Sequence, residues 1–175
     1  MDILEQILLQ GKKPARYTGG EWNAVHKQWD KVDLKIVFAF PDVYEVGMSY
    51  LGLQIFYEII NRREDSLMER VFAPWPDMEE KMREYGLSLF SIESRRPVRD
   101  FDVVAFTLQY ELSYTNVLNM LDLAGIPLEA QQRDEQDPLV IAGGPCAFNP
   151  EPMARFFDLL VIGEGEEVIG ELIDA

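Results

Sequence analysis

The sequence has one cysteine, Cys146, and one histidine, His26, among its 175 residues. A single cysteine excludes an intramolecular disulfide and any self-contained zinc or iron–sulfur site, because each of these needs several ligands. His26 falls in the N-terminal part of the chain, far in sequence from Cys146, so no nucleophile–base pair of these two residues is proposed. We therefore predict no catalytic residue and no metal ligand, and we expect the chain to be inert by itself.

Basic residues are also scarce. Lys and Arg number 16 against 31 Asp and Glu, which gives a net charge of −15. Nucleic acids and anionic membranes both require a basic face, so this charge argues against either partner. No apolar run approaches the roughly 20 residues of a membrane span, and the acidic start Met1–Glu5 lacks the basic region of a signal peptide. We expect a cytoplasmic protein.

Hydrophobic residues, at 47% of the chain, are frequent enough to form a full core. Short apolar runs alternate with helical patterns, which is typical of βαβ units. The predicted strands are 34–40, 67–75, 87–92, 103–107, 139–142 and 159–162. The predicted helices are 1–9, 51–60 with Ser49 as its N-cap, 77–85, 111–123, 152–157 and a terminal helix from 163. The pattern predicts an α/β, Rossmann-like fold with a mostly parallel sheet of five or more strands flanked by helices.

Two regions are expected along the chain. Residues 1–32, with mixed composition and several Gly and Pro, form an N-terminal helical arm, and residues 33–175 form the Rossmann-type domain. The terminal helix is followed by no C-cap signal, so we expect the chain to be part of a longer protein.

The first loop after a strand contains Asp42, Tyr44 and Gly47 in a D-x-Y-x-x-G spacing. Loops that follow parallel strands gather at one edge of the sheet, where ligands bind in open α/β folds. Tyr44 could press onto a flat cofactor while Gly47 permits close backbone approach. Alternatively, Asp42 is a turn residue and Tyr44 packs over the edge of the sheet.

Two further loops, 107–113 and 143–151, are expected at the same edge. The turn at Gly143, Gly144 and Pro145 either makes room for a ligand or supplies positive φ angles. Thr107 and Gln109 either face the ligand or cap the next helix.

Phosphate-binding motifs are missing. No strand is followed by a Walker loop or a G-x-G-x-x-G, and the run after Gly163 contains Glu164, Glu166 and Glu167. These carboxylates suit a helix start but would repel a pyrophosphate there. A nucleotide-binding function is therefore the last of the alternatives.

Several segments together resemble a known family. They are Pro14 to Tyr17, Pro41 to Ser49, Phe106 to Glu111, Ala142 to Pro152 and Val161 to Glu167. They are similar to the N-terminal part of radical S-adenosylmethionine proteins that contain a cobalamin-binding domain. The resemblance covers nearly the whole chain.

The resemblance implies a domain that places cobalamin near a downstream barrel in the same chain, and that barrel would hold S-adenosylmethionine and a [4Fe–4S] cluster. By position, Asp42 and Gly47 match the D-x-H-x-x-G loop of cobalamin domains, with Tyr44 in place of the cobalt-ligating histidine. Thr107-Leu108-Gln109 stands where an S-x-L segment is expected, and Gly143-Gly144 matches the glycine turn. The candidate cofactor-binding residues are Asp42, Tyr44, Gly47, Thr107, Gln109, Gly143, Gly144 and Pro145.

Three functions follow, in order of preference. The first is an accessory domain that binds a corrinoid, without a protein ligand to cobalt. The second is a degenerate domain that binds no cobalamin and only docks on and shields the barrel. The third is a nucleotide-binding Rossmann-like domain. An apolar groove over the 41–48 and 143–151 loops would favour the corrinoid, whereas a closed edge would favour docking.

Overall fold

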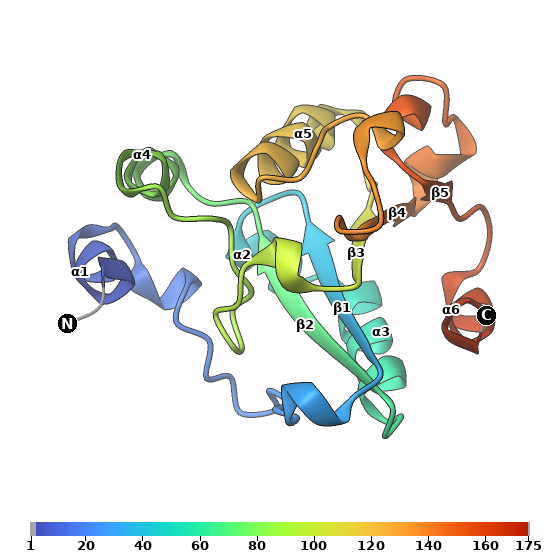
Figure 1. The fold of residues 1–175 in the computed structure, drawn as a ribbon, viewed down its shortest axis with the longest axis horizontal. Helices are drawn as coiled ribbons and strands as arrows, with labels where there is room; N and C mark the ends of the chain where they lie inside the picture. Colours follow the sequence, from blue (N-terminus) through green and yellow to red (C-terminus); the bar gives the residue numbers. More distant parts are fainter. Residues whose placement is uncertain (1–2, 175) are drawn as a thin grey trace.

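A five-stranded parallel sheet forms the centre of the computed structural model, which describes residues 3–174 (Figure 1). The strands are β1 (Leu34–Phe40), β2 (Ser66–Phe72), β3 (Val103–Thr107), β4 (Leu139–Gly143) and β5 (Leu159–Leu160). The α-helices are α1 (Ile3–Gln10), α2 (Tyr44–Met48), α3 (Leu51–Asn61), α4 (Pro76–Tyr85), α5 (Tyr114–Leu123) and α6 (Gly165–Asp174). The predicted α/β class with a parallel sheet is confirmed.

Helices cover both faces of the sheet, which explains why the strands are continuous apolar runs. In β1, Val37 and Ala39 point to the face covered by α4 and α5 and belong to one buried cluster. Ile36, Phe38 and Phe40 point to the opposite face and belong to a second cluster, with α3 and α6. The period of two along the strand separates these two cores.

The arm predicted for residues 1–32 packs against this body. Ile7 and Leu8 of α1 are buried in the same cluster as α4 and α5, and Trp29 meets Phe101 edge to face with ring centroids 5.0 Å apart. Figure 1 shows α1 next to α4, beyond the β2 edge.

The prediction of a strand at residues 87–92 is wrong. The segment contains one isolated antiparallel bridge, Phe90 to Pro97, and no ladder. Its backbone donors are used elsewhere: Leu89 N–H reaches the Leu123 carbonyl at 3.0 Å and Ile92 N–H reaches the Arg70 carbonyl at 2.9 Å. The apolar side chains are buried, as in a strand, but the hydrogen bonds go to a helix end and to a single residue of β2.

Two predicted boundaries also change. Ser49 does not cap α3: Tyr50 holds the N-cap position, and the Ser49 hydroxyl donates instead to the Val46 carbonyl at 2.7 Å, after the short helix α2. β2 ends at Phe72 rather than residue 75, because the chain turns away before Pro74 and Pro76.

The strand order β2-β1-β3-β4-β5 reverses direction between β1 and β3. Ligands of open α/β sheets bind outside the carboxyl ends of the strands at such a switch point. The loops expected there do meet. Asn116 Nδ2, at the start of α5, donates to the Pro41 carbonyl at 2.9 Å, and Cys146 N–H donates to the Leu108 carbonyl at 3.0 Å.

Candidate functional site

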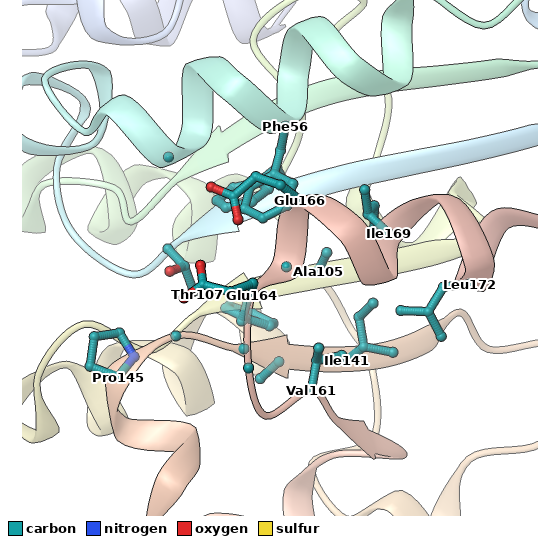
Figure 2. A pocket seen from close by; sticks show the side chains of 18 of the residues that line it. Phe56, Ala105, Thr107, Ile141, Pro145, Val161, Glu164, Glu166, Ile169 and Leu172 are labelled. Carbon is teal, nitrogen blue, oxygen red and sulfur yellow. The ribbon is translucent and has the colours of Figure 1, made fainter.

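A cavity of about 460 Å³ lies between the sheet, α3 and α6 (Figure 2). Strands β1, β3 and β4 form its floor, Phe56 of α3 covers one side, and Ile169 and Leu172 of α6 cover another. Its lining residues are Phe38, Tyr50, Gly52, Phe56, Met68, Ala105, Phe106, Thr107, Ile141, Ala142, Gly143, Gly144, Pro145, Phe148, Val161, Gly163, Glu164, Gly165, Glu166, Ile169 and Leu172.

The cavity has an apolar end and a polar end. Figure 2 shows Ile141, Ile169 and Leu172 at one end, along the sheet. Thr107 and Glu164 lie at the other end with Pro145, next to the carboxyl edge of the strands. A cavity of this kind suits a ligand with an apolar body and a polar head at the mouth.

Glycines bring α6 close enough to form the wall. A Cβ on Gly165, the first residue of α6, would lie 2.6 Å from the ring of Phe56, so a side chain there would have to displace Phe56 or α6. Gly163 has φ +126°, a backbone conformation that side chains disfavour. The Gly-Glu-Gly-Glu run therefore shapes the wall of the cavity.

The two glycines of the predicted turn differ. Gly144 has φ +102°, and a Cβ there would lie 3.0 Å from the Leu108 carbonyl oxygen. Gly143 has no positive φ, and its Cβ would meet the Val161 carbonyl oxygen at an ordinary 3.5 Å. Both line the cavity with Pro145. Glycine at position 144 is therefore required by the backbone conformation. At position 143 the missing side chain leaves free space at the cavity.

Gln109 stands behind the lining rather than in it. Its Nε2 donates to Thr107 Oγ1 at 2.5 Å and to Tyr50 Oη at 3.0 Å. Thr107 and Tyr50 are both lining residues of the cavity. Sequence reasoning missed Tyr50. Its place directly before α3, in the same strand-to-helix connection as the D-x-Y-x-x-G loop, could have revealed it.

Tyr44 lies outside the cavity lining. Its hydroxyl donates to Glu21 Oε1 of the arm at 2.8 Å, and its ring meets Phe72 edge to face at 5.4 Å. Burial, together with the bond to Glu21, raises the pKa of Tyr44 to about 12. Its hydroxyl therefore stays protonated at neutral pH and is bonded to the arm.

Asp42 and Gly47 are also absent from the lining. Asp42 accepts a hydrogen bond from the Tyr110 hydroxyl, and this bond raises the pKa of Tyr110 to about 12. A Cβ on Gly47 would lie 2.3 Å from the Phe72 ring, so this glycine permits α2 to pack on β2. In this structure the D-x-Y-x-x-G loop makes packing and hydrogen-bond contacts within the protein.

Within residues 3–174, no cluster of three or more His, Cys, Asp or Glu side chains is arranged to hold a metal ion. Cys146 is half-buried beside the cavity turn, and His26 is exposed in the arm. Over the same described residues, no helix has the length and apolar character needed to cross a membrane.

Residues 52–175 match a family model described as "Radical SAM proteins, N-terminal", and this match spans well over half of the chain. The chain belongs to this family. The N-terminal radical SAM domain is also 24% identical over 148 residues to uncharacterised protein MJ0966 of Methanocaldococcus jannaschii. That alignment covers 82% of this chain and 27% of the relative, so the chain spans about a quarter of the relative's length.

The residues matched by the family model include most of those that line the cavity. The match begins at residue 52 and includes Thr107, Gly143, Gly144 and all of α6. The arm and the D-x-Y-x-x-G loop precede it. The part of this radical SAM N-terminal domain that matches the family model thus forms most of the cavity.

Proposed function

We propose that this domain binds a corrinoid through the cavity between the sheet, α3 and α6, and presents it to a radical SAM barrel elsewhere in the same protein. The observation that carries the proposal is the cavity itself. Its volume of about 460 Å³ falls in the range of small-molecule sites, roughly 300–1,000 Å³. One end of it, with Thr107 and Pro145, lies at the carboxyl edge of the strands, where the fold class binds ligands.

The part of a corrinoid proposed to enter the cavity is its nucleotide tail, since the largely apolar lining would suit a planar base. Thr107, Gly143 and Pro145 would hold that tail at the mouth. When bound, the corrinoid would supply cobalt chemistry, and the protein would supply binding and orientation.

The D-x-Y-x-x-G loop does not fit a cobalt ligand. The Tyr44 hydroxyl is bonded to Glu21 and has a raised pKa, and Asp42 is bonded to Tyr110. The proposed corrinoid is therefore held without a protein ligand from this loop. S-adenosylmethionine and a [4Fe–4S] cluster are proposed for the barrel, since the matched family is described as the N-terminal part of radical SAM proteins.

Hydroxocobalamin is the probe that tests the proposal. Equilibrium dialysis should show stoichiometric binding to the chain, and Gly143→Val, which narrows the mouth, should weaken it. Electron paramagnetic resonance of the Co(II) form should show no coupling from protein imidazole, with or without His26→Ala. If dialysis detects no retention by either this chain or the full protein, the corrinoid proposal is wrong.

A second function, docking and shielding of the barrel without a ligand, is favoured by one observation. Large apolar side chains in the connections after β1, β3 and β4 are exposed: Leu51, the first residue of α3, by 70%, Leu112 by 87% and Phe148 by 69%. Exposed apolar groups that gather on one surface mark interaction sites. Retention of the barrel by this chain with no effect of hydroxocobalamin would favour docking alone.

A further inference from the structure

Two residues that line the cavity, Tyr50 and Thr107, carry hydroxyl groups, and one side chain bonds to both. Gln109 Nε2 donates to Thr107 Oγ1 and to Tyr50 Oη. Each hydroxyl accepts one hydrogen bond in this way and keeps its own hydrogen to donate. In the described part of the chain, neither hydroxyl donates to a protein acceptor. Their hydrogens are therefore available to a ligand in the cavity.

The surroundings of these hydroxyls favour direct contact with a ligand. Thr107 is 5% exposed, Tyr50 is half-buried, and the Tyr50 ring packs on Phe40 at 5.5 Å. Packing of this kind fixes the ring, so its hydroxyl has a defined direction. A buried donor without an acceptor costs free energy, and a ligand that accepts its hydrogen removes that cost.

The charges at the cavity act against anions. Glu164 and Glu166 are the charged residues of the lining, and the described lining contains no Lys, Arg or His. The start of α6 could attract a phosphate through its free N–H groups, but Glu166 and Glu167 fill its first turn. These carboxylates already compensate the positive end of the helix dipole.

We infer that this cavity selects an uncharged group with hydrogen-bond acceptors over a phosphate monoester: Tyr50 and Thr107 donate to the acceptors, Gln109 positions both hydroxyls, and Glu164 and Glu166 repel the anion. This inference rests on the proposed function, since it requires a ligand in the cavity. A corrinoid is compatible with it, because its single phosphodiester charge is offset by positive charge on the cobalt-bearing ring.

The test uses two probes that differ by one phosphate: α-ribazole, the benzimidazole nucleoside of cobalamin, and α-ribazole 5′-phosphate. Titration calorimetry at low salt should show the nucleoside binding about tenfold or more tightly than its phosphate, a moderate factor because charges at an open mouth are screened. The double variant Glu164→Gln/Glu166→Gln should close this gap. Glu167→Gln, on the same helix turn but outside the lining, should leave it.

The hydroxyl pair is tested with the nucleoside alone. Tyr50→Phe and Gln109→Leu should each weaken α-ribazole binding by about tenfold, the size of one net hydrogen bond. Tyr110→Phe, which removes a tyrosine hydroxyl outside the lining, should not.

The inference would be overturned if α-ribazole 5′-phosphate bound as tightly as α-ribazole. It would also be overturned if the Tyr50→Phe variant bound α-ribazole with unchanged affinity. Hydroxocobalamin that binds unchanged to Tyr50→Phe, or that binds when α-ribazole does not, also overturns it while leaving the proposed function standing. If hydroxocobalamin, α-ribazole and α-ribazole 5′-phosphate all fail to bind, the proposed function itself is wrong.

Discussion

The two sides of the sheet switch point are built differently. On the β3 and β4 side, glycines and apolar side chains leave a cavity beneath α6. At the β2 edge, buried charges fill the space. Arg70 and Glu93 have side chains only 1% and 0% exposed and pair at 2.6 Å. Arg70 also contacts Glu21 at 3.2 Å and lies over the Tyr57 ring.

The D-x-Y-x-x-G loop belongs to the second region. The arm holds it at two points, through Glu21 on Tyr44 and through Arg16 on Glu45 at 2.9 Å. The glycine turn belongs to the first region. Two motifs that converge at one sheet edge therefore have separate roles: one fastens the arm, and the other borders the cavity. Substitutions in the two regions should separate stability from binding.

The largest effect is expected from Glu93→Gln. It leaves Arg70 buried without its main partner, which typically costs about 3–5 kcal/mol. Glu93 accepts both the backbone N–H and the Nε of Arg70, at 2.8 and 2.6 Å, so the loss affects two bonds. Urea unfolding measures the change. Hydroxocobalamin binding by the folded variant should stay as in the original chain.

Glu58→Gln is the matched control. Glu58 pairs with Arg62 across one helix turn on an exposed surface, where such pairs contribute roughly 0–1 kcal/mol. Equal effects of the two substitutions would show that the β2 edge gains nothing from its buried charges and would remove the contrast between the regions.

Much of the fold could be predicted because its strands are covered on both faces. The run 34–40 and the run 103–107 match β1 and β3 as observed. Prediction failed where side chains are buried as in a strand but the backbone does not form the hydrogen bonds of a strand. Residues 87–92 are apolar and largely buried, but their backbone groups bond partly to nearby residues 96–98 and partly to Leu123 and Arg70, without a ladder, and a pattern of side chains does not show this.

The location of some candidate residues could also be predicted from the strands, whereas their role as a site stays a prediction. Strand ends locate Thr107 and the Gly143–Pro145 turn at the carboxyl edge. The direction of Tyr44 depends on Glu21, and the cavity depends on Gly165 meeting Phe56. Both are contacts between elements far apart in sequence, and neither spacing nor residue type encodes them.

A smaller effect separates the two glycines of the turn. Gly144→Ala should destabilise the protein by about 1–3 kcal/mol, the usual cost of a strained backbone position, because its φ is +102° and its Cβ would crowd Leu108. Gly143→Ala should change stability by only about 0.5 kcal/mol, since its Cβ meets ordinary contacts.

On β4, Gly143 shares the face of Ile141, toward the cavity. Thermal unfolding and hydroxocobalamin dialysis of both variants distinguish the roles; a stable Gly144→Ala variant would show that this turn does not need its positive φ.

The smallest effect concerns the arm and pH. The hydrogen bond from Arg16, aided by Lys13, lowers the pKa of Glu45 to about 2 from an ordinary 4.5. A carboxyl whose pKa is lower in the folded state stabilises the fold above the unfolded pKa, and this stabilisation is lost as pH falls toward the folded pKa. The difference in urea midpoint between the original chain and Glu45→Gln should therefore be present at pH 7 and shrink between about pH 4.5 and 2. The difference should be slight, because the Glu45 side chain is 44% exposed and exposed pairs are screened.

In an Arg16→Met background the same difference should be smaller and nearly independent of pH. A pH-independent difference in both backgrounds would mean that the charge of Glu45 does not hold the arm, and that the loop is positioned by its other contacts, such as those of Tyr44 and Asp42.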